Sequence, residues 1–233
     1  MRVISFITQK GGTGKSTLTV SLAVAAESGG EKVCIIDLDP QGTSASWYQT
    51  RTAERPAVLN HDQARDLTTT LNRLETAGFT LALIDTPGSD SHGTRAAMRA
   101  ADLCLVPVRP SEADLKATMP TVRALHDLNQ EFALVINQAP VHKQTKLAAT
   151  AVMRMSSEGP VLPLAIASRV EHQYAYAVGQ GVTEYAPEGK GAAEIAELWA
   201  ASKKRLEAKY GQRNEAQRGA LGNGSERASR LRG

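Results

Sequence analysis

Short, continuous apolar runs alternate along this chain with segments whose apolar residues recur at helical spacing. The apolar runs have the length of buried strands and cover residues 3–7, 32–37, 81–85, 103–108, 132–136 and 161–166. The helical patterns cover residues 18–26, 43–55, 61–77, 94–101, 112–128, 146–157 and 192–210. Apolar strands that alternate with helices are typical of a parallel sheet buried on both faces. The pattern therefore predicts a single α/β domain with a doubly wound, mostly parallel sheet and helices on both faces.

Several predicted helices carry residues that commonly begin or end a helix. Residues 61–77 place their leucines on one helical face, and Gly78 follows them as a stop signal. Ser111 is placed to cap the helix at residues 112–128. Pro120 lies inside that helix, and we expect it to kink or divide the helix because proline lacks a backbone donor.

The composition changes near Gly211, where apolar residues become scarce. The whole chain has a net charge of +3, yet the segment from Lys203 to the end carries nine Lys/Arg and only three Asp/Glu. A polar, basic segment cannot bury enough apolar surface to fold on its own. We therefore expect one folded domain over residues 1–210 and a basic, disordered tail over residues 211–233.

The sequence between the first strand and the first helix has the composition of a phosphate-binding loop. Residues 9–17 read Gln-Lys-Gly-Gly-Thr-Gly-Lys-Ser-Thr. Glycines allow consecutive backbone N–H groups to turn inward, and the N-terminus of the following helix adds positive charge at the same point. Lys15 is placed to reach the β- and γ-phosphates of a nucleotide, and the Ser16 hydroxyl to bind Mg²⁺. An ordinary glycine-rich turn is the alternative, but such a turn has little use for Gly-Lys-Ser-Thr.

Two further predicted strands end in aspartates. Residues 37–42 read Asp-Leu-Asp-Pro-Gln-Gly, and residues 85–88 read Asp-Thr-Pro-Gly. Open α/β sheets place their chemistry at the carboxyl ends of the strands, so both segments are expected beside the phosphate loop. Asp85 is placed to hold Mg²⁺ through water. Asp-Pro-Gln-Gly is also a competent turn, so a structural role for residues 37–42 is the alternative.

With Lys10 directly before the paired glycines, the sequence KGGTGKST resembles the deviant Walker A box of the ParA/MinD family of P-loop ATPases. The resemblance implies that Lys10 is the signature lysine, which reaches across an ATP-sandwich dimer to the nucleotide of the other subunit. It also implies that Asp39 orients or activates the attacking water, that Asp37 supports the network of Mg²⁺ and Lys15, and that residues 1–210 are a P-loop ATPase domain.

The motifs and the resemblance together define the expected site. The catalytic residues are Lys10, Lys15 and Asp39. The nucleotide-binding residues are Lys10, Gly11, Gly12, Thr13, Gly14, Lys15, Ser16, Thr17 and, near the adenine, Asn137. The residues around Mg²⁺ are Ser16, Asp37 and Asp85. The two switch segments, which sense the γ-phosphate, contain Gln41, Gly42, Thr86, Pro87 and Gly88.

The resemblance also implies how the protein works. It implies an ATP hydrolase with slow intrinsic turnover and with ATP and Mg²⁺ as cofactors. ATP drives formation of a homodimer, the dimer binds DNA nonspecifically, and a ParB-like or centromere-binding adaptor protein stimulates hydrolysis and release. Because the first strand begins at the start of the chain, we expect no DNA-binding domain before it, as in the short plasmid-type ParA partition ATPases. The expected location is cytoplasmic and nucleoid-associated, with no membrane partner.

Four basic residues are candidates for the DNA contacts. Family members that bind DNA carry a basic residue after the sixth strand, which suggests Arg169. Lys203, Lys204 and Arg205 crowd the last helix, where cations also favour the helix dipole. A solvated surface arginine is the equally simple interpretation of Arg169.

Other functions on this loop make different demands on the sequence. A MinD-like membrane regulator needs a C-terminal amphipathic helix with bulky apolar residues, which residues 211–233 lack. A metal-cluster ATPase needs a close cysteine pair, whereas Cys34 and Cys104 lie far apart in apolar runs and are expected to be buried, reduced thiols. A related tyrosine kinase needs a tyrosine-rich tail, and no tyrosine follows Tyr210. The motifs leave open a small-molecule ligase, and a protein cluster or organelle as cargo in place of a plasmid.

Overall fold

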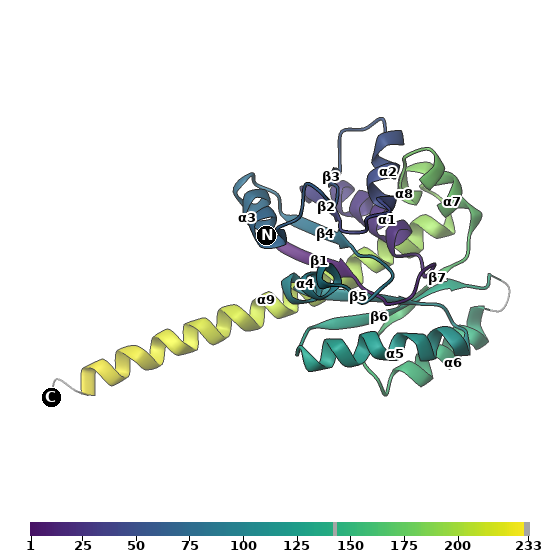
Figure 1. Cartoon of the computed structure of the whole chain (residues 1–233). Coiled ribbons are helices and arrows are strands. Elements are labelled where there is room, and N and C mark those ends of the chain that lie inside the picture. Colours follow the sequence, from purple (N-terminus) through teal and green to yellow (C-terminus); the bar gives the residue numbers. More distant parts are fainter. Residues whose placement is uncertain (142–143, 231–233) are drawn as a thin grey trace.

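The computed structural model describes residues 1–141 and 144–230 of the chain, which form one α/β domain around a seven-stranded sheet (Figure 1). The strands are β1 (Arg2–Phe6), β2 (Val33–Asp37), β3 (Ala57–Leu59), β4 (Leu81–Asp85), β5 (Leu103–Val108), β6 (Phe132–Ala139) and β7 (Val161–Ala167). Their order in the sheet is β3-β2-β4-β1-β5-β6-β7, and every neighbouring pair is parallel. The prediction of a doubly wound, mostly parallel sheet is confirmed.

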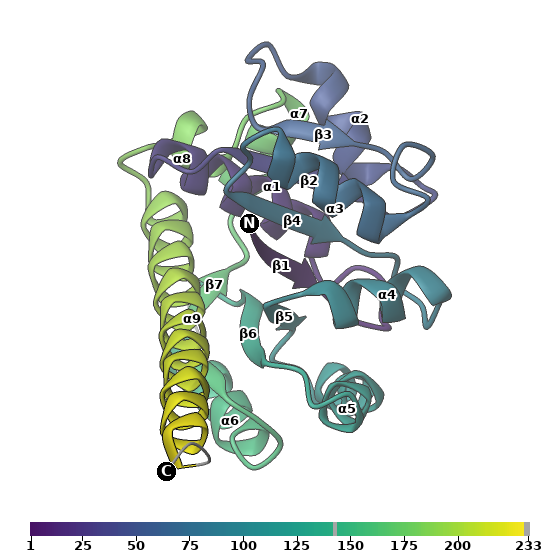
Figure 2. The same ribbon diagram turned by 90° about the vertical axis from the view of Figure 1, so that its left-hand side faces the viewer.

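Helices cover both faces of the sheet, as Figure 2 shows from the side. They are α1 (Lys15–Ser28), α2 (Thr43–Thr50), α3 (Leu67–Thr76), α4 (His92–Ala100), α5 (Glu112–Asp127), α6 (Gln144–Met155), α7 (Val170–Ala177), α8 (Val182–Tyr185) and α9 (Lys190–Arg230). Side chains of α1, α2, α7, α8 and α9 share one buried cluster with the strands. Side chains of α3, α4, α5 and α6 form the cluster on the opposite face. The central strands therefore bury both of their faces, which explains why they appear in the sequence as unbroken apolar runs.

The register of the central strands brings the three sequence motifs together. Phe6, the last residue of β1, pairs with Asp85 of β4, and Asp85 pairs in turn with Asp37 of β2. The phosphate loop follows β1 directly, so the loop and both aspartates emerge side by side from three neighbouring strands. This is the carboxyl edge of the sheet, where open α/β folds bind their ligands.

The structure contains elements that the apolar pattern did not predict. The edge strand β3 has only three residues, all half-buried, and is too short to give a periodic signal. The short helices α7 and α8 occupy residues for which we predicted no element. The helix expected from residue 61 begins only at Leu67, where the Asp66 side chain accepts a hydrogen bond from the Thr69 N–H. The helix α5 runs through Pro120 without dividing.

The largest difference concerns the last helix. Helix α9 continues to Arg230 and projects beyond the body of the domain (Figure 1), whereas the composition predicted a disordered tail from residue 211. The scarcity of apolar residues that predicted disorder concerns how little apolar surface the segment can bury. Its Ala, Gln, Glu and Arg residues favour a helix, whereas Gly219, Gly222 and Gly224 oppose one, and apolar content measures neither effect. No helix among the described residues is both long enough and apolar enough to cross a bilayer.

Candidate functional site

The phosphate loop is shaped by glycines and clamped by the end of β6. Gly12 and Gly14 have φ angles of 73° and 90°, which L side chains rarely adopt. A Cβ atom on Gly14 would also collide with the Asn137 side-chain amide. Asn137 Nδ2 donates to the Thr13 carbonyl at 2.7 Å, and Gln138 Nε2 donates to the Gly12 carbonyl at 3.1 Å. These contacts fix the loop just before α1 begins at Lys15, so the helix N-terminus faces the loop.

A hollow of about 600 Å³ lies at the loop. It is lined by Gly11, Gly12, Gly14, Lys15, Ser16, Thr17, Asp39, Pro40, Gln41, Thr43, Pro87, Gly88 and Ser89. The structure thus brings together most of the residues predicted from three separate motifs. The combination of loop N–H groups, a helix N-terminus and a buried lysine suits a polyphosphate.

Lys15 lies at the base of this hollow and is buried, with only 7% of its surface exposed. Its Nζ atom lies 3.5 Å from the Lys10 carbonyl oxygen. Burial lowers the pKa of Lys15, while the nearby Asp85 and Asp39 carboxylates raise it. A buried ammonium with so few protein partners gains most from a ligand that carries negative charge.

Asp85 is fully buried between the loop and α2. The Ser44 hydroxyl donates to its Oδ2 atom at 2.7 Å, and the Ser16 hydroxyl also interacts with the carboxylate. Its Oδ1 atom is buried without a hydrogen-bond partner. Burial, opposed by the hydrogen bond from Ser16 and reinforced by Asp37, raises the pKa of Asp85 to about 7.

These observations fit a magnesium ion that arrives with a nucleotide. The orphaned Asp85 Oδ1 atom needs a partner, and the neighbouring Ser16 hydroxyl is an oxygen ligand of the kind Mg²⁺ prefers. Mg²⁺ keeps several waters and is commonly held by one or two protein groups plus phosphate oxygens, so Ser16 and Asp85 are sufficient donors.

Asp37 and Asp39 have different surroundings although they are two residues apart. Asp37 is buried, accepts from the N–H groups of Asp39 at 3.0 Å and Ala45 at 2.9 Å, and its pKa is raised mainly by burial. It therefore holds the backbone of the first switch segment. Asp39 lines the hollow, and its Oδ1 atom accepts from the Gln41 N–H at 3.0 Å. Of these two carboxylates, only that of Asp39 lines the hollow at the phosphate loop.

Some of the predicted switch residues line the hollow, and others hold the surrounding backbone. Gln41, Pro87 and Gly88 line the hollow. A Cβ atom on Gly88 would lie 3.0 Å from the Gly11 backbone, so only glycine allows this close approach of the second switch to the phosphate loop. Gly42 instead caps α2 with a φ angle of 64°. The Thr86 hydroxyl points away and donates to the Phe6 carbonyl at 2.7 Å.

A second hollow of about 190 Å³ continues from the first, since Gly14 and Thr17 line both. Asn137, predicted to lie near the adenine, is part of its wall. Arg169, predicted to contact DNA, also lies in this wall, where its Nη2 atom is 2.7 Å from Glu194 Oε1. The charge of Arg169 is compensated by Glu194, so a DNA contact of Arg169 stays a prediction.

Lys10 is the one predicted catalytic residue that does not line the phosphate hollow among the residues the structure describes. Its Nζ atom contacts Asp114 Oδ1 on α5 in the same chain. The lysine therefore pairs with α5 and not with a group that lines the hollow.

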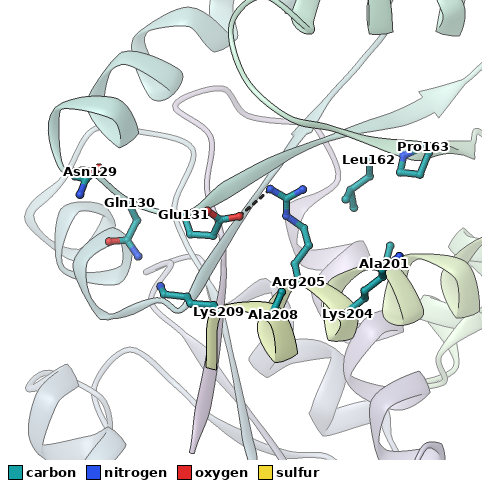
Figure 3. Close-up of a pocket in the computed structure, with 10 residues that line it drawn as sticks. All are labelled: Asn129, Gln130, Glu131, Leu162, Pro163, Ala201, Lys204, Arg205, Ala208 and Lys209. Carbon is teal, nitrogen blue, oxygen red and sulfur yellow. Dashed lines mark hydrogen bonds and ion pairs between the residues drawn. The ribbon is translucent and has the colours of Figure 1, made fainter. Parts of the chain in front are cut away.

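The other predicted DNA contacts lie at the opposite edge of the sheet. Lys204, Arg205 and Lys209 of α9 line a hollow of about 720 Å³ together with the loop before β6 and the start of β7 (Figure 3). Arg205 Nη2 lies 2.7 Å from Glu131 Oε1. Lys203 and Lys204 make no hydrogen bond or ion pair with the described part of the chain. The structure therefore places three of the four predicted residues on α9. Arg169 lies elsewhere, beside Glu194 of α9, and Glu194 and Arg205 are about 16 Å apart along the helix axis at 1.5 Å per residue.

Sequence reasoning missed several residues that shape the site. Gln138 was overlooked although it follows Asn137 at the end of a predicted strand, the position at which such residues face a ligand. Ser44 and Tyr176 act through tertiary contacts, with the Tyr176 hydroxyl donating to the Thr43 carbonyl beside the first switch. Asp114 lies in the predicted helix at residues 112–128, three residues after its predicted cap Ser111. The local sequence does not indicate which distant residues these three contact.

The site geometry agrees with a sequence comparison. Residues 4–207 match the CobQ/CobB/MinD/ParA nucleotide-binding domain. The chain belongs to this family. It is therefore an ATP hydrolase of the ParA/MinD kind, and the predicted family resemblance and enzymatic activity are confirmed.

Individual relatives are named for carboxysome distribution and for chromosome partitioning. The chain is 39% identical over 124 residues to the maintenance of carboxysome distribution protein A of Gloeobacter kilaueensis, which covers 52% of this chain and 55% of that protein. The alignment thus spans about half the length of that relative. The chain is also 28% identical over 230 residues to the chromosome-partitioning ATPase Soj of Thermus thermophilus, covering 82% of this chain and 91% of Soj.

Solved structures share the fold at lower identity. The septum site-determining protein MinD of Pyrococcus horikoshii, complexed with Mg-ADP, has a TM-score of 0.70 and 21% identity over 89% of this chain and 98% of its own. A chain of the MinC:MinD cell division protein complex of Aquifex aeolicus has a TM-score of 0.74 and 16% identity over 88% of this chain and 96% of that chain. At these identities the likeness concerns the fold alone.

Proposed function

We propose that this chain is a cargo-positioning ATPase of the partition type, which dimerises on ATP, binds DNA nonspecifically and lets go when a partner protein stimulates hydrolysis. The main support is that the phosphate loop, Asp85 and Asp37 lie side by side at the ends of three neighbouring strands. Asp39 lines the same hollow as the loop. A site built in this way can bind a nucleoside triphosphate and activate a water at its γ-phosphate.

The residues divide the chemistry between binding and activation. The loop N–H groups and Lys15 hold the β- and γ-phosphates, and the adjoining hollow beside Asn137 accepts the base. Mg²⁺ held by Ser16 and, through water, by Asp85 would neutralise charge on the phosphates. Asp39 accepts a hydrogen bond from the attacking water and orients it in line with the leaving oxygen. As the water oxygen bonds to the γ-phosphorus and the bond to the β-phosphate oxygen of the leaving ADP breaks, the proton of the water passes to Asp39 and from there to the released phosphate.

The dimer follows from the position of Lys10. Since Lys10 pairs with α5 and not with a group that lines its own hollow, its ammonium serves the transferring phosphoryl group of a second subunit, where it stabilises developing charge. Two nucleotides at the interface then supply contacts that the nucleotide-free chains lack. ATP thereby controls whether one or two copies of the basic surface on α9 are presented together.

The basic hollow on α9 is the proposed DNA surface (Figure 3). Lys204 lines this hollow and Lys203 precedes it on α9, and neither side chain forms an ion pair with the described part of the chain. Phosphates of DNA supply their counter-charge. Contacts of this kind are independent of sequence and weaken steeply with salt. Arg169 lies apart from this surface and pairs with Glu194, so the main DNA contacts are assigned to α9.

For the cargo we favour a protein assembly over a plasmid. The support is the 39% identity, over about half of each chain, to a protein named for the distribution of carboxysomes. Plasmid or chromosome partition is the second candidate, supported by the longer but weaker match to Soj. In either case an adaptor on the cargo would stimulate hydrolysis, and the MinC:MinD complex of a structural relative illustrates that this fold accepts protein partners.

Co-sedimentation tests the proposal against a membrane-based function. The protein is incubated with DNA or with anionic liposomes, in each case with ATP, with ADP and without nucleotide. We expect it to sediment with DNA only in the presence of ATP and to ignore liposomes under all conditions. Sedimentation with liposomes and not with DNA would replace the proposal by a MinD-like membrane function. The genomic neighbour of the coding sequence, or loss of a cargo's distribution on deletion, then separates protein assemblies from plasmids.

A further inference from the structure

The side chain of Lys10 is held by a carboxylate of its own subunit. Lys10 Nζ contacts Asp114 Oδ1 across more than a hundred residues of sequence, and 35% of the Lys10 side chain is exposed against 9% for Asp114. The phosphate loop is also tied to the same helix by its backbone, because the Gln9 N–H donates to the Thr121 hydroxyl at 3.2 Å. The lysine therefore has a defined place in the unpaired chain.

Asp114 is itself firmly positioned. It lies in the first turn of α5, where its N–H donates to the Ser111 hydroxyl at 3.2 Å and its Oδ2 atom contacts the same hydroxyl. Burial raises the pKa of Asp114, but the hydrogen bonds from Lys10 and Ser111 prevail and lower it overall. A buried carboxylate of this kind needs a cation nearby, since removing one partner of a buried pair is costly.

A second cation, Arg109, lies beside Asp114. Arg109 Nε is 3.7 Å from Asp114 Oδ1, too far for a hydrogen bond, and this buried nitrogen has no hydrogen-bond partner. Arg109 also lies against the phosphate loop, because a Cβ atom on Gly12 would come 3.0 Å from its Nη2 atom. A small movement would let the guanidinium take the place that Lys10 occupies.

We propose that Asp114 holds Lys10 within its own subunit while the chain is unpaired, and that Arg109 replaces Lys10 on Asp114 when Lys10 crosses to the nucleotide of a second subunit. This inference rests on the proposed function, from which it takes the ATP-dependent dimer and the task of Lys10. The Lys10–Asp114 pair is thus a latch. Asp114 is a positioning residue that opposes dimerisation, and Arg109 is a positioning residue that favours it.

The first test uses the nucleotide-free, full-length chain and does not depend on dimerisation. The rate at which acetic anhydride modifies Lys10 is followed by mass spectrometry in the parent chain, in Asp114→Asn and in Glu112→Gln. Asp114→Asn keeps the size of the side chain and its hydrogen bond to Ser111 but removes the charge, so we expect Lys10 to react several-fold faster in this variant. Glu112→Gln removes a charge from the same helical turn without touching Lys10 and should react as the parent does. Equal rates in all three proteins would overturn the proposal.

The second test measures dimerisation at saturating Mg-ATP by analytical ultracentrifugation, with Asp39→Ala in every protein to slow hydrolysis. Asp114→Asn removes the latch, worth roughly threefold per subunit as partly exposed ion pairs are, but also the weaker Arg109–Asp114 pair that favours the dimer. This variant should therefore dimerise at a concentration lower by up to roughly tenfold for the two latches of a dimer. Arg109→Ala should need a higher concentration, and Lys10→Ala should cancel the effect of Asp114→Asn. An effect of Asp114→Asn that persists without Lys10 would contradict the latch. A parent chain that stays monomeric with ATP, while Asp114→Asn still exposes Lys10 to acetic anhydride, would instead contradict the proposed function.

Discussion

The two edges of the sheet use charge in opposite ways. At the carboxyl edge, Lys15, Asp37 and Asp85 are buried, and each carboxylate accepts hydrogen bonds from the chain. At the amino edge, Lys203 and Lys204 lie on the surface of α9 with no partner within the described chain. Buried charges interact strongly and at fixed geometry, which is what phosphoryl chemistry requires. Exposed charges interact weakly and without geometric demands, which is what nonspecific DNA binding requires.

The contrast predicts that single substitutions have large effects at one edge and graded effects at the other. A buried charge that loses its ligand leaves an uncompensated neighbour, whereas a surface lysine is one of several similar contacts. The predictions below use this difference, from the largest expected effect to the smallest.

Lys15→Ala should remove Mg-ATP binding. Loss of a buried ammonium opposite the phosphates costs on the order of 3–5 kcal/mol, which corresponds to more than about a hundredfold in affinity. Isothermal titration calorimetry measures the effect, with the exposed Lys116→Ala as the matched control. Normal affinity in Lys15→Ala would show that the hollow is not the phosphate site.

Asp39→Ala should keep ATP binding and lose turnover. Its carboxylate faces the hollow and, among the described residues, accepts a hydrogen bond only from the Gln41 N–H, so its loss leaves the loop and Lys15 in place. Loss of a group that orients the attacking water lowers the rate by roughly 10²–10⁴-fold. Phosphate release at saturating ATP measures turnover, and an unchanged rate would assign the water to another residue.

Lys203→Glu combined with Lys204→Glu should weaken DNA binding while leaving ATP affinity unchanged. Removing two phosphate contacts from each subunit, four from the ATP-bound dimer, should lower the slope of log K against log salt by about 3.6, because each contact contributes about 0.9. Gel shifts over a range of salt concentrations measure the slope. Lys116→Glu on α5 is the control, since it changes a surface lysine far from α9, and an unchanged slope in the double variant would move the DNA surface elsewhere.

Asp85 should make the nucleotide-free, Mg²⁺-free protein less stable as the pH rises from about 4 to 7. Its pKa is raised to about 7 in the folded chain, against an ordinary value of 3.8, so the folded state retains a proton that the unfolded state has lost. The free energy of unfolding therefore falls by about 1.4 kcal/mol per pH unit from this group, and Asp85→Asn removes that contribution. Urea unfolding at several pH values compares the two slopes, and parallel slopes would refute the raised pKa.

The central part of the fold and the phosphate site were predictable from the sequence, because their signals are local. A buried parallel strand is an unbroken apolar run, and a phosphate loop must have its glycines between such a strand and a helix. Asp37, Asp39 and Asp85 were identified for the same reason, since each lies at or just after the end of a strand.

The rest depends on contacts between distant segments. The partner of Lys10 is Asp114, which looks like any first-turn acid until the fold places α5 beside the loop. The Arg169–Glu194 pair joins the end of β7 to α9, and no spacing in the sequence indicates it. Helix α9 runs beyond residue 211, where the composition predicts a disordered tail, because low apolar content measures how little surface a segment can bury and not whether it is helical.

The central claim is that ATP at the carboxyl edge controls DNA binding at the amino edge by joining two copies of the basic surface. Fluorescence anisotropy of a labelled DNA duplex, titrated with the hydrolysis-deficient Asp39→Ala protein, tests this directly. With ATP the affinity should exceed that with ADP by roughly 10²–10⁴-fold, the gain expected when two linked surfaces bind at once. Equal affinity with ATP and ADP would contradict the claim and leave α9 as a basic arm that binds DNA regardless of the nucleotide.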